Sequence, residues 1–434
     1  MKKIYLSLFT LLAVCLNAQN PCVNGRYVND VYATSTLSSN IVYGSNKKYD
    51  NTTQTLLLDF YQGTGDTSTA RPLIVFCHGG SFFGGTKTDA DMVAIGQSFA
   101  KKGFAVASME YRVGFFPFDS SGIVPALIRA VQDMKAAVRF FYKDKLNSNL
   151  YKIDTNNIFI GGTSAGAITA LHMAYLNKSC EINSYVPPTQ LNNMGGLEGL
   201  SGNQCFSTKV KGVINVCGAL GKYGWMEQGD VPLVSMHGTN DATVLYSRGK
   251  ANPGIPMLYL DGSRMLFAGT QISGINHQFY TWYGKGHVPY QSNALYMDST
   301  IQFVKQFLIN TMGCPNTPTL LANTPAGVVN AYPFTNCTVN VAPSPCAVGI
   351  NELQLNNLVE MVYPNPSTSD ITVTFKRADN YQVVITDIAG KVVVSEKVNA
   401  TNYTLQKEQF NAGVYFLKVS TSYGEYYTHK LILY

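Results

Sequence analysis

Two hydrophobic patterns alternate along the chain up to residue 310. Short unbroken apolar runs, typical of strands buried on both faces of a sheet, alternate with longer segments in which apolar residues recur at helical spacing. The strand-like runs cover residues 56–61, 73–77, 104–109, 158–160, 210–216, 231–236 and 278–283, and the helical segments cover 89–101, 125–145 and 291–310. This alternation predicts an α/β fold with a doubly wound, mostly parallel sheet. In such sheets the ligand site lies beyond the carboxyl ends of the strands.

The pattern changes after residue 313. Residues 314–350 hold six prolines and three cysteines without helical periodicity, so we interpret them as a linker. Residues 351–434 hold short alternating or β-branched segments separated by turns such as Ala389-Gly390, without any cysteine. They predict a small all-β sandwich as a separate tail domain.

The first residues have the pattern of a secretory signal peptide. Lys2 and Lys3 precede an apolar run over 4–16, and Ala18 is a small residue at the expected cleavage point. Cys15 raises the alternative of a lipoprotein, but Val14 is larger than the residue usual before a lipidated cysteine. We therefore assign 1–18 to the signal peptide and 19–313 to the α/β domain. No later run is long enough for a membrane helix.

Charge argues against a nucleic-acid partner. Cleavage of the signal peptide removes Lys2 and Lys3 and lowers the net charge from +6 to +4. This is weak for so long a chain, and no basic cluster is interleaved with aromatic residues.

The nine cysteines fit an exported protein, in which some should be oxidised. Cys180 and Cys205 bracket a polar insertion and are the best disulfide candidates. Cys314 and the two later cysteines of the linker could supply another pair. Cys77 and Cys217 lie in apolar runs as expected of buried thiols. No C-x-x-C pair exists, so the sequence predicts no metal site of that kind.

The clearest chemical motif spans residues 157–170 and reads N-I-F-I-G-G-T-S-A-G-A-I-T-A. A short strand turns into a helix at a G-x-S-x-G motif, with Ser164 at the apex. This nucleophile elbow would expose the serine hydroxyl and place the N–H of Ala165 at the start of the helix, where it can meet an oxyanion. The alternative is an ordinary turn rich in glycine and serine.

A serine nucleophile needs a base, for which His287 is the best candidate. It follows the last strand-like run of the sheet in the sequence G-K-G-H, on a loop that could reach Ser164. We expect the other histidines to serve elsewhere. They are His78 and His237, which should brace loops at strand ends, His172 two turns down the elbow helix, His277 before a strand, and His429 in the tail.

The base in turn needs a carboxylate. Asp241 follows the strand-like run 231–236, which gives the chain order Ser, Asp, His expected for this fold. Asp261 is the alternative acid, and Asp241 could instead cap a turn.

Oxyanion donors should come from the loop after an early strand. Residues 78–85, H-G-G-S-F-F-G-G, directly follow the strand-like run 73–77. We expect the N–H groups of Gly80, Ser81 and Ala165 to be the donors, with His78 and Gly79 shaping the loop.

With these motifs, residues 71–306 resemble an α/β-hydrolase of the carboxylesterase and hormone-sensitive-lipase-like group, which includes feruloyl and acetylxylan esterases. The matching motifs are H-G-G-S-F-F-G-G at 78–85, E-Y-R at 110–112, Q-D-M-K-A-A-V-R-F at 132–140, G-T-S-A-G at 162–166, H-G-T-N-D at 237–241 and G-H at 286–287. The resemblance implies that Ser164, Asp241 and His287 form the catalytic triad. It also implies that Tyr111, Arg112, Asp133 and Arg139 are scaffold residues. Ser81 stands where a third glycine is usual.

The resemblance implies a secreted carboxylester hydrolase that needs no metal or organic cofactor and acts on a small-molecule or polymeric ester. A serine peptidase of the same fold, a polyester-degrading esterase and a catalytically silent surface-binding scaffold are the alternatives. We expect segments 178–209 and 252–274 to shape the acid and alcohol pockets.

The tail resembles a type A sorting domain of the type IX secretion system. The resemblance rests on Y-P-N-P at 363–366, D-I-A-G-K at 387–391, A-G-V-Y at 412–415 and the final K-L-I-L at 430–433. It implies that the type IX machinery is a partner, and that the protein is exported through the periplasm and outer membrane to the cell surface or medium. The alternative is a carbohydrate-binding sandwich.

Overall fold

A computed structural model describes residues 22–252, 258–314, 358–421 and 426–434. The chain divides into two compact units, Met1–Pro343 and Ser344–Tyr434. The predicted signal peptide and all of the predicted linker except Cys314 lie outside the described residues.

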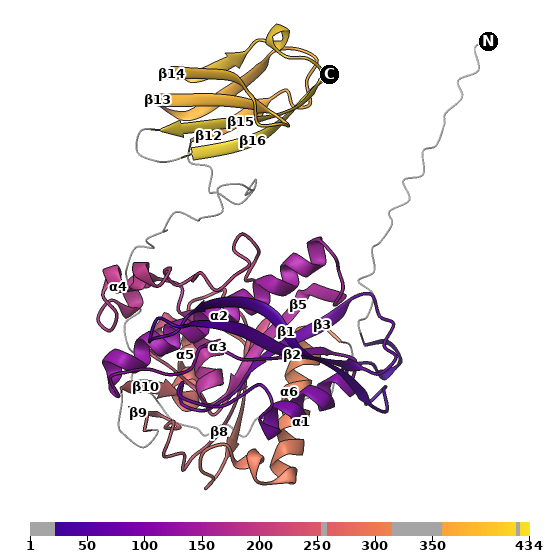
Figure 1. Cartoon of the computed structure of the whole chain (residues 1–434), viewed down its shortest axis with the longest axis vertical. Helices are drawn as coiled ribbons and strands as arrows, with labels where there is room; N and C mark the ends of the chain where they lie inside the picture. Colours follow the sequence, from indigo (N-terminus) through magenta and orange to yellow (C-terminus); the bar gives the residue numbers. More distant parts are fainter. Residues whose placement is uncertain (1–21, 253–257, 315–357, 422–425) are drawn as a thin grey trace, which may run out of the picture. The chain divides into compact units, whose positions relative to one another are not determined.

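The first unit is built on an eight-stranded sheet with the order β1-β2-β4-β3-β5-β6-β8-β11 (Figure 1). The pairs β1/β2 and β2/β4 are antiparallel, and every later pair is parallel. This confirms the predicted mostly parallel α/β fold. The strands are β1 Ser35–Lys47, β2 Thr53–Gly63, β3 Arg71–Cys77, β4 Ala105–Met109, β5 Ile153–Thr163, β6 Gly212–Val216, β8 Leu233–Gly238 and β11 His277–Trp282.

Helices cover both faces of this sheet because its central strands are apolar on both sides. Along β3, Leu73 and Val75 join one hydrophobic core, whereas Ile74 and Phe76 join the other. The first core also contains residues of α2 (Ser120–Leu146) and α3 (Ala165–Tyr175), and the second contains residues of α1 (Ala90–Lys101) and α6 (Ala294–Thr311). Figure 1 shows α1 and α6 next to each other. No helix of the described residues is long and apolar enough to cross a membrane.

The start of α2 differs from the sequence prediction. Pro125 was expected in its first turn, but the helix begins five residues earlier, at Ser120. The reason is Asp119, whose carboxylate accepts a hydrogen bond from the N–H of Ser121 at 2.8 Å and caps the helix. Pro125 is therefore accommodated inside the helix.

Several elements were missed. The edge strand β1 is rich in serine and asparagine and largely exposed, so it has little hydrophobic signal. Segment 252–274 holds parts of a small antiparallel sheet, in the order β7-β10-β9, and the helix α5 (Ser263–Ser273). The strands of that sheet are β7 Ala219–Leu220, β9 Arg248–Lys250 and β10 Tyr259–Gly262.

The disulfides also required correction. Cys314 pairs with Cys22, across a sequence separation of 292, and not with another cysteine of the linker. Cys180 and Cys205 are both disulfide-bonded, and their pairing with each other stays a prediction. Cys77 and Cys217 are free and buried, as expected.

The second unit is all-β, as predicted. The five strands of its described residues form an antiparallel sheet in which β13 pairs with β12, β14 and β15, and β15 pairs with β16. The sequence predicts short strands in this unit, but β13 is 17 residues long. The bounds are β12 Val359–Tyr363, β13 Ile371–Asp387, β14 Val392–Leu405, β15 Gly413–Thr421 and β16 Tyr426–Leu433 (Figure 1). The unit has a hydrophobic core of its own.

Two buried histidines predict a loss of stability in acid. Burial lowers the pKa of His172 to about 4 and that of His277 to about 3. The unfolded chain takes up these two protons below about pH 6.5, whereas the folded chain does not, so the free energy of unfolding should fall as the pH drops from about 6.5 towards 4. Each proton contributes up to about 1.4 kcal/mol per pH unit.

Urea unfolding across this pH range tests the prediction. His172→Gln removes one of the two titrating histidines. The free energy of unfolding of this variant should therefore depend less steeply on pH, by the contribution of one proton, even if its stability at pH 7 also changes. An unchanged pH dependence in that variant would contradict the assignment.

Candidate active site

Ser164 lies at a sharp turn between β5 and α3. Its backbone has φ 54° and ψ −116°, a conformation that residues other than glycine rarely adopt. Its N–H donates a hydrogen bond to the carbonyl of Val216 at 2.9 Å. The turn requires glycine on both sides. A Cβ at Gly162 would lie 2.4 Å from the carbonyl carbon of Gly166, and a Cβ at Gly166 would lie 2.0 Å from the carbonyl oxygen of Cys77.

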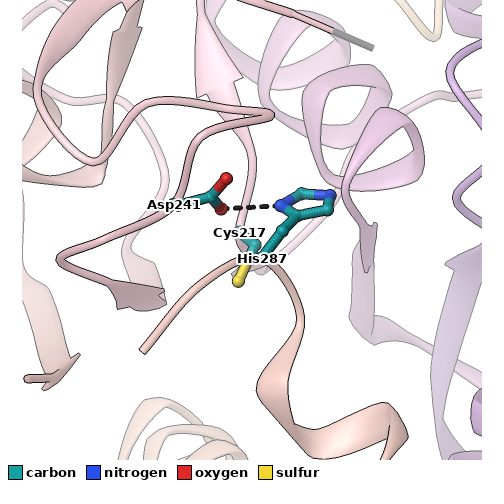
Figure 2. Close-up of side chains that lie close together, drawn as sticks. All are labelled: Cys217, Asp241 and His287. Atoms are coloured by element: carbon teal, nitrogen blue, oxygen red, sulfur yellow. Dashed lines mark hydrogen bonds and ion pairs between the residues drawn. The ribbon is translucent and has the colours of Figure 1, made fainter. Parts of the chain in front are cut away.

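The loop between β11 and α6 carries His287 to this serine. Its Nε2 lies 2.8 Å from Ser164 Oγ, and its Nδ1 lies 2.6 Å from Asp241 Oδ2. Figure 2 shows the imidazole turned towards the carboxylate of Asp241, with Cys217 beside them. The structure therefore brings together the three side chains that the sequence predicted as nucleophile, base and acid. If Nδ1–H donates to Asp241, Nε2 is left free to accept the serine proton.

Asp241 has partners for both of its oxygens. Oδ1 accepts hydrogen bonds from the N–H groups of Thr243 and Val244, each at 2.9 Å. Oδ2 lies 2.6 Å from His287 and 3.2 Å from Nε2 of His237. Burial alone would raise the pKa of Asp241, but the hydrogen bonds from His237 and His287 hold it well below its ordinary value. The carboxylate is therefore charged when it orients His287.

The contact between His237 and Asp241 was missed from the sequence, where His237 was expected only to brace a loop. It does brace one, because Nε2 lies 2.8 Å from the carbonyl oxygen of Val244. The sequence offered one signal for this contact. His237 and Asp241 are four residues apart, and a tight loop after a strand can bring two such residues together.

Asp261, the alternative acid, is engaged elsewhere. Its carboxylate accepts hydrogen bonds from Nε and Nη2 of Arg248, at 2.6 and 2.7 Å, and from the N–H of Tyr223 at 2.8 Å. Its side chain is therefore committed to a partly buried ion pair.

The glycine-rich loop after β3 lies against the serine. A Cβ at Gly79 would be 3.5 Å from the Cβ of Ser164, and Ser81 and Ala165 line the same pocket as Ser164. Gly80 has φ 101° and Ser81 has φ 57°. His78 Nδ1 lies 2.7 Å from the carbonyl oxygen of Gly79, the next residue of this loop.

The proposed scaffold residues hold the surrounding frame. The ring of Tyr111 stacks on His78 at 4.4 Å, and its hydroxyl donates to the carbonyl of Gly79 at 3.2 Å. Arg112 forms a buried ion pair with Asp133, with its Nη2 2.8 Å from Oδ1. These contacts fix the loop that carries Gly80 and Ser81 relative to α2.

Insertion 178–209 packs on this frame and does not form the pocket. Glu198 forms ion pairs with Lys135 and Arg139 of α2, and Ser201 Oγ donates to Asp133 at 2.5 Å. The described lining of the pocket contains no residue of the insertion. The expectation that this insertion shapes an acid or alcohol pocket is therefore wrong for the described pocket.

The pocket beside Ser164 has a volume of about 520 Å³, including its open mouth, and is almost entirely apolar. Leu258 and Leu260, from segment 252–274, contribute to it as expected. Its other walls come from α2, α3 and the loops after β3, β8 and β9. The lining residues are Ser81, Phe82, Ile123, Val124, Leu127, Ser164, Ala165, Ile168, Thr243, Val244, Ala251, Leu258 and Leu260.

Cys217 is a neighbour of the dyad that the sequence placed only in a buried run. One ligand atom from each of Cys217, Asp241 and His287 lies within 4.8 Å of the others, a spacing that a metal ion could bridge. However, Asp241 and His287 already hydrogen-bond to each other. Burial, together with the charge of Asp241, raises the pKa of the Cys217 thiol, which keeps it protonated. The cluster fits a hydrogen-bonded dyad packed on a neutral thiol.

Two family models match parts of the chain. Residues 58–251 match the BD-FAE family, and residues 361–434 match the secretion system C-terminal sorting domain. A comparison with curated protein sequences found no match.

Among solved structures, esterase 2 of Thermogutta terrifontis is similar. Its apo form is 20% identical with a TM-score of 0.47, and the match covers 64% of this chain and 95% of that one. Its propionate-bound form is 19% identical with a TM-score of 0.48, covering 65% and 96%.

The sheet, the serine turn and the matched family define a carboxylic ester hydrolase of the α/β-hydrolase class. More particularly, the chain carries a BD-FAE domain, which belongs to the esterase and hormone-sensitive-lipase-like hydrolases, and a type IX sorting domain. The sorting domain marks the protein for secretion or attachment to the cell surface.

A matched pair of glycines tests the loop after β3. A Cβ at Gly80 would lie 2.2 Å from the carbonyl oxygen of Gly84, whereas a Cβ at Gly84 would meet nothing within 4 Å. Gly80→Ala should therefore displace the loop and lower kcat for ester hydrolysis by about 10²–10³-fold, the usual loss for an oxyanion donor. Gly84→Ala should stay within about threefold of the parent. Equal rates in the two variants would show that the loop does not act on the reaction.

Proposed function

We propose that the protein is a secreted serine carboxylester hydrolase that works through an acyl-enzyme on Ser164. His287 Nε2 takes the hydroxyl proton as Ser164 Oγ attacks the ester carbonyl, and then gives that proton to the departing alcohol. A water molecule, deprotonated by the same nitrogen, releases the acid and restores the serine. Asp241 holds the tautomer of His287 and stabilises its charged form.

One observation carries this proposal. Ser164 Oγ, His287 and Asp241 form a continuous hydrogen-bonded chain with distances of 2.8 and 2.6 Å. This is the reach that a nucleophile, a base and its orienting acid require. The burial of Asp241 and its four hydrogen-bonding contacts support the role of acid.

The negative charge on the carbonyl oxygen would be stabilised by backbone N–H groups of Gly80, Ser81 and Ala165. The N–H of Ala165 begins α3, where the helix dipole favours an anion. Support for the other two comes from the glycine-rich loop, which lies against Ser164. This mechanism assigns no step to a metal ion or organic cofactor.

The apolar lining of the pocket favours an uncharged, aliphatic acyl group. Ile123, Leu127 and Ile168 offer no polar partner to a hydroxylated or charged acid.

We further infer that the tail engages the type IX machinery and that the protein crosses the periplasm and outer membrane. The identity of the tail as a sorting domain supports this route.

Ser164→Ala should abolish turnover of a soluble ester while the protein stays folded. A residual rate of about 10³–10⁴-fold above water is expected from the oxyanion hole and binding alone. Asp241→Asn should lower kcat by about 10⁴-fold through the wrong tautomer of His287. Steady-state kinetics with circular dichroism checks both. Turnover of the Ser164→Ala variant within tenfold of the parent would show that Ser164 is not the nucleophile. A larger loss of kcat in Asp261→Asn than in Asp241→Asn would show that Asp241 is not the acid.

A series of nitrophenyl esters tests the acyl pocket. Burial of each further methylene is worth about 0.8 kcal/mol, so kcat/KM should rise up to about fourfold per methylene from acetate to butyrate and fall once the pocket is full. Val124→Phe, which adds volume in the pocket from α2, should reverse the preference towards acetate. A preference for charged or hydroxylated acyl groups would contradict the assignment.

A further inference from the structure

Four phenylalanines, three of them exposed, form a cluster that the proposed reaction does not use. We call Phe83, Phe115, Phe116 and Phe118 the phenylalanine platform. Phe83 packs edge-to-face on Phe115 at 6.1 Å and on Phe118 at 5.6 Å, and Phe116 packs on Phe118 at 5.9 Å. Phe115 is buried, but Phe83, Phe116 and Phe118 are 58%, 72% and 50% exposed. Contiguous exposed apolar side chains of this kind mark interaction sites.

The platform is held in place from both of its segments. The N–H of Gly114 donates to the carbonyl of Phe82 at 2.7 Å, which joins the loop after β3 to the segment before α2. Arg129 Nη2 donates to the carbonyl of Gly114 at 3.0 Å, and Asp119 caps α2 directly after Phe118. The rings are therefore presented by anchored backbone.

Both segments of the platform adjoin, along the chain, residues that line the pocket beside Ser164. Ser81 and Phe82 line that pocket, and Phe83 is the next residue on the same loop. On the other segment, Ile123 and Val124 line the pocket one turn after the capped start of α2. A substrate that extends from the pocket along these two segments would meet the platform.

We propose that the phenylalanine platform binds an aromatic ring in the alcohol half of the ester, outside the acyl pocket. This inference rests on the proposed function. Residues 79–85 and 113–118 contain no charged side chain, so the surface favours an uncharged group. Edge-to-face contacts with several phenylalanines suit an aromatic ring more than an alkyl chain, because the ring adds a quadrupole interaction to the burial of area.

The test compares methyl butyrate with 2-naphthyl butyrate, which share the acyl group. In Phe83→Ser/Phe118→Ser, KM for the naphthyl ester should rise about tenfold, while kcat/KM for the methyl ester should stay within twofold, since each aromatic contact contributes a severalfold effect. Phe83→Tyr/Phe118→Tyr keeps both rings and should restore the parent KM. Leu146→Ser, which removes a 74% exposed apolar side chain at the far end of α2, should change neither ester.

An equal loss on both esters would overturn the inference, because it would assign the phenylalanines to the shape of the catalytic loop. An unchanged KM for the naphthyl ester would also overturn it, and a loss of self-association in the same variant would then assign the platform to a second copy of the chain.

If the parent hydrolyses neither ester, the proposed function fails instead. Fluorescence titration of 2-naphthyl butyrate into Ser164→Ala, with and without the two serine substitutions, still measures the platform: a tenfold weaker Kd supports it, and an equal Kd refutes it.

Discussion

The site depends on one close approach of backbone to backbone. The start of α3 reaches the end of β3 so closely that a Cβ at Gly166 would lie 2.0 Å from the carbonyl oxygen of Cys77. Only this approach lets Ser164 take its strained conformation, with its N–H tied to Val216 of the neighbouring strand β6. Two parallel neighbours of β5 thus fix the serine, and the loop that continues from β3 is brought over it. The strain at one residue is offset by a sheet buried on both faces.

The charged part of the site follows from the same order of strands. Asp241 follows β8 and His287 follows β11, and these neighbouring parallel strands end at the same edge of the sheet. Hydrogen bonds from His237 and His287 hold the carboxylate ionised, and the N–H groups of Thr243 and Val244 bind its other oxygen, so the imidazole is oriented before any substrate arrives. The pocket that Ser164 lines is almost entirely apolar, so it adds few polar groups that could compete with these contacts.

Much of this could be predicted because the central strands and the serine turn leave strong local signals. Continuous apolar runs mark strands such as β3, and the glycines around Ser164 are demanded by local geometry. Features that depend on distant partners were not predictable. The exposed strand β1 has no apolar run, the bond between Cys22 and Cys314 joins residues 292 positions apart, and the pocket walls come from several elements. The role of insertion 178–209 depended on ion pairs of Glu198 with α2, which no local pattern reveals.

The central claim is that Ser164 is the nucleophile activated by His287. The most direct measurement is peptide mapping by mass spectrometry after reaction of the full chain with a fluorophosphonate. The account predicts a single adduct on Ser164 that forms in the parent protein and is lost, or slowed by several orders of magnitude, in His287→Ala. An adduct on another residue, or labelling of Ser164 at the same rate without His287, would contradict it.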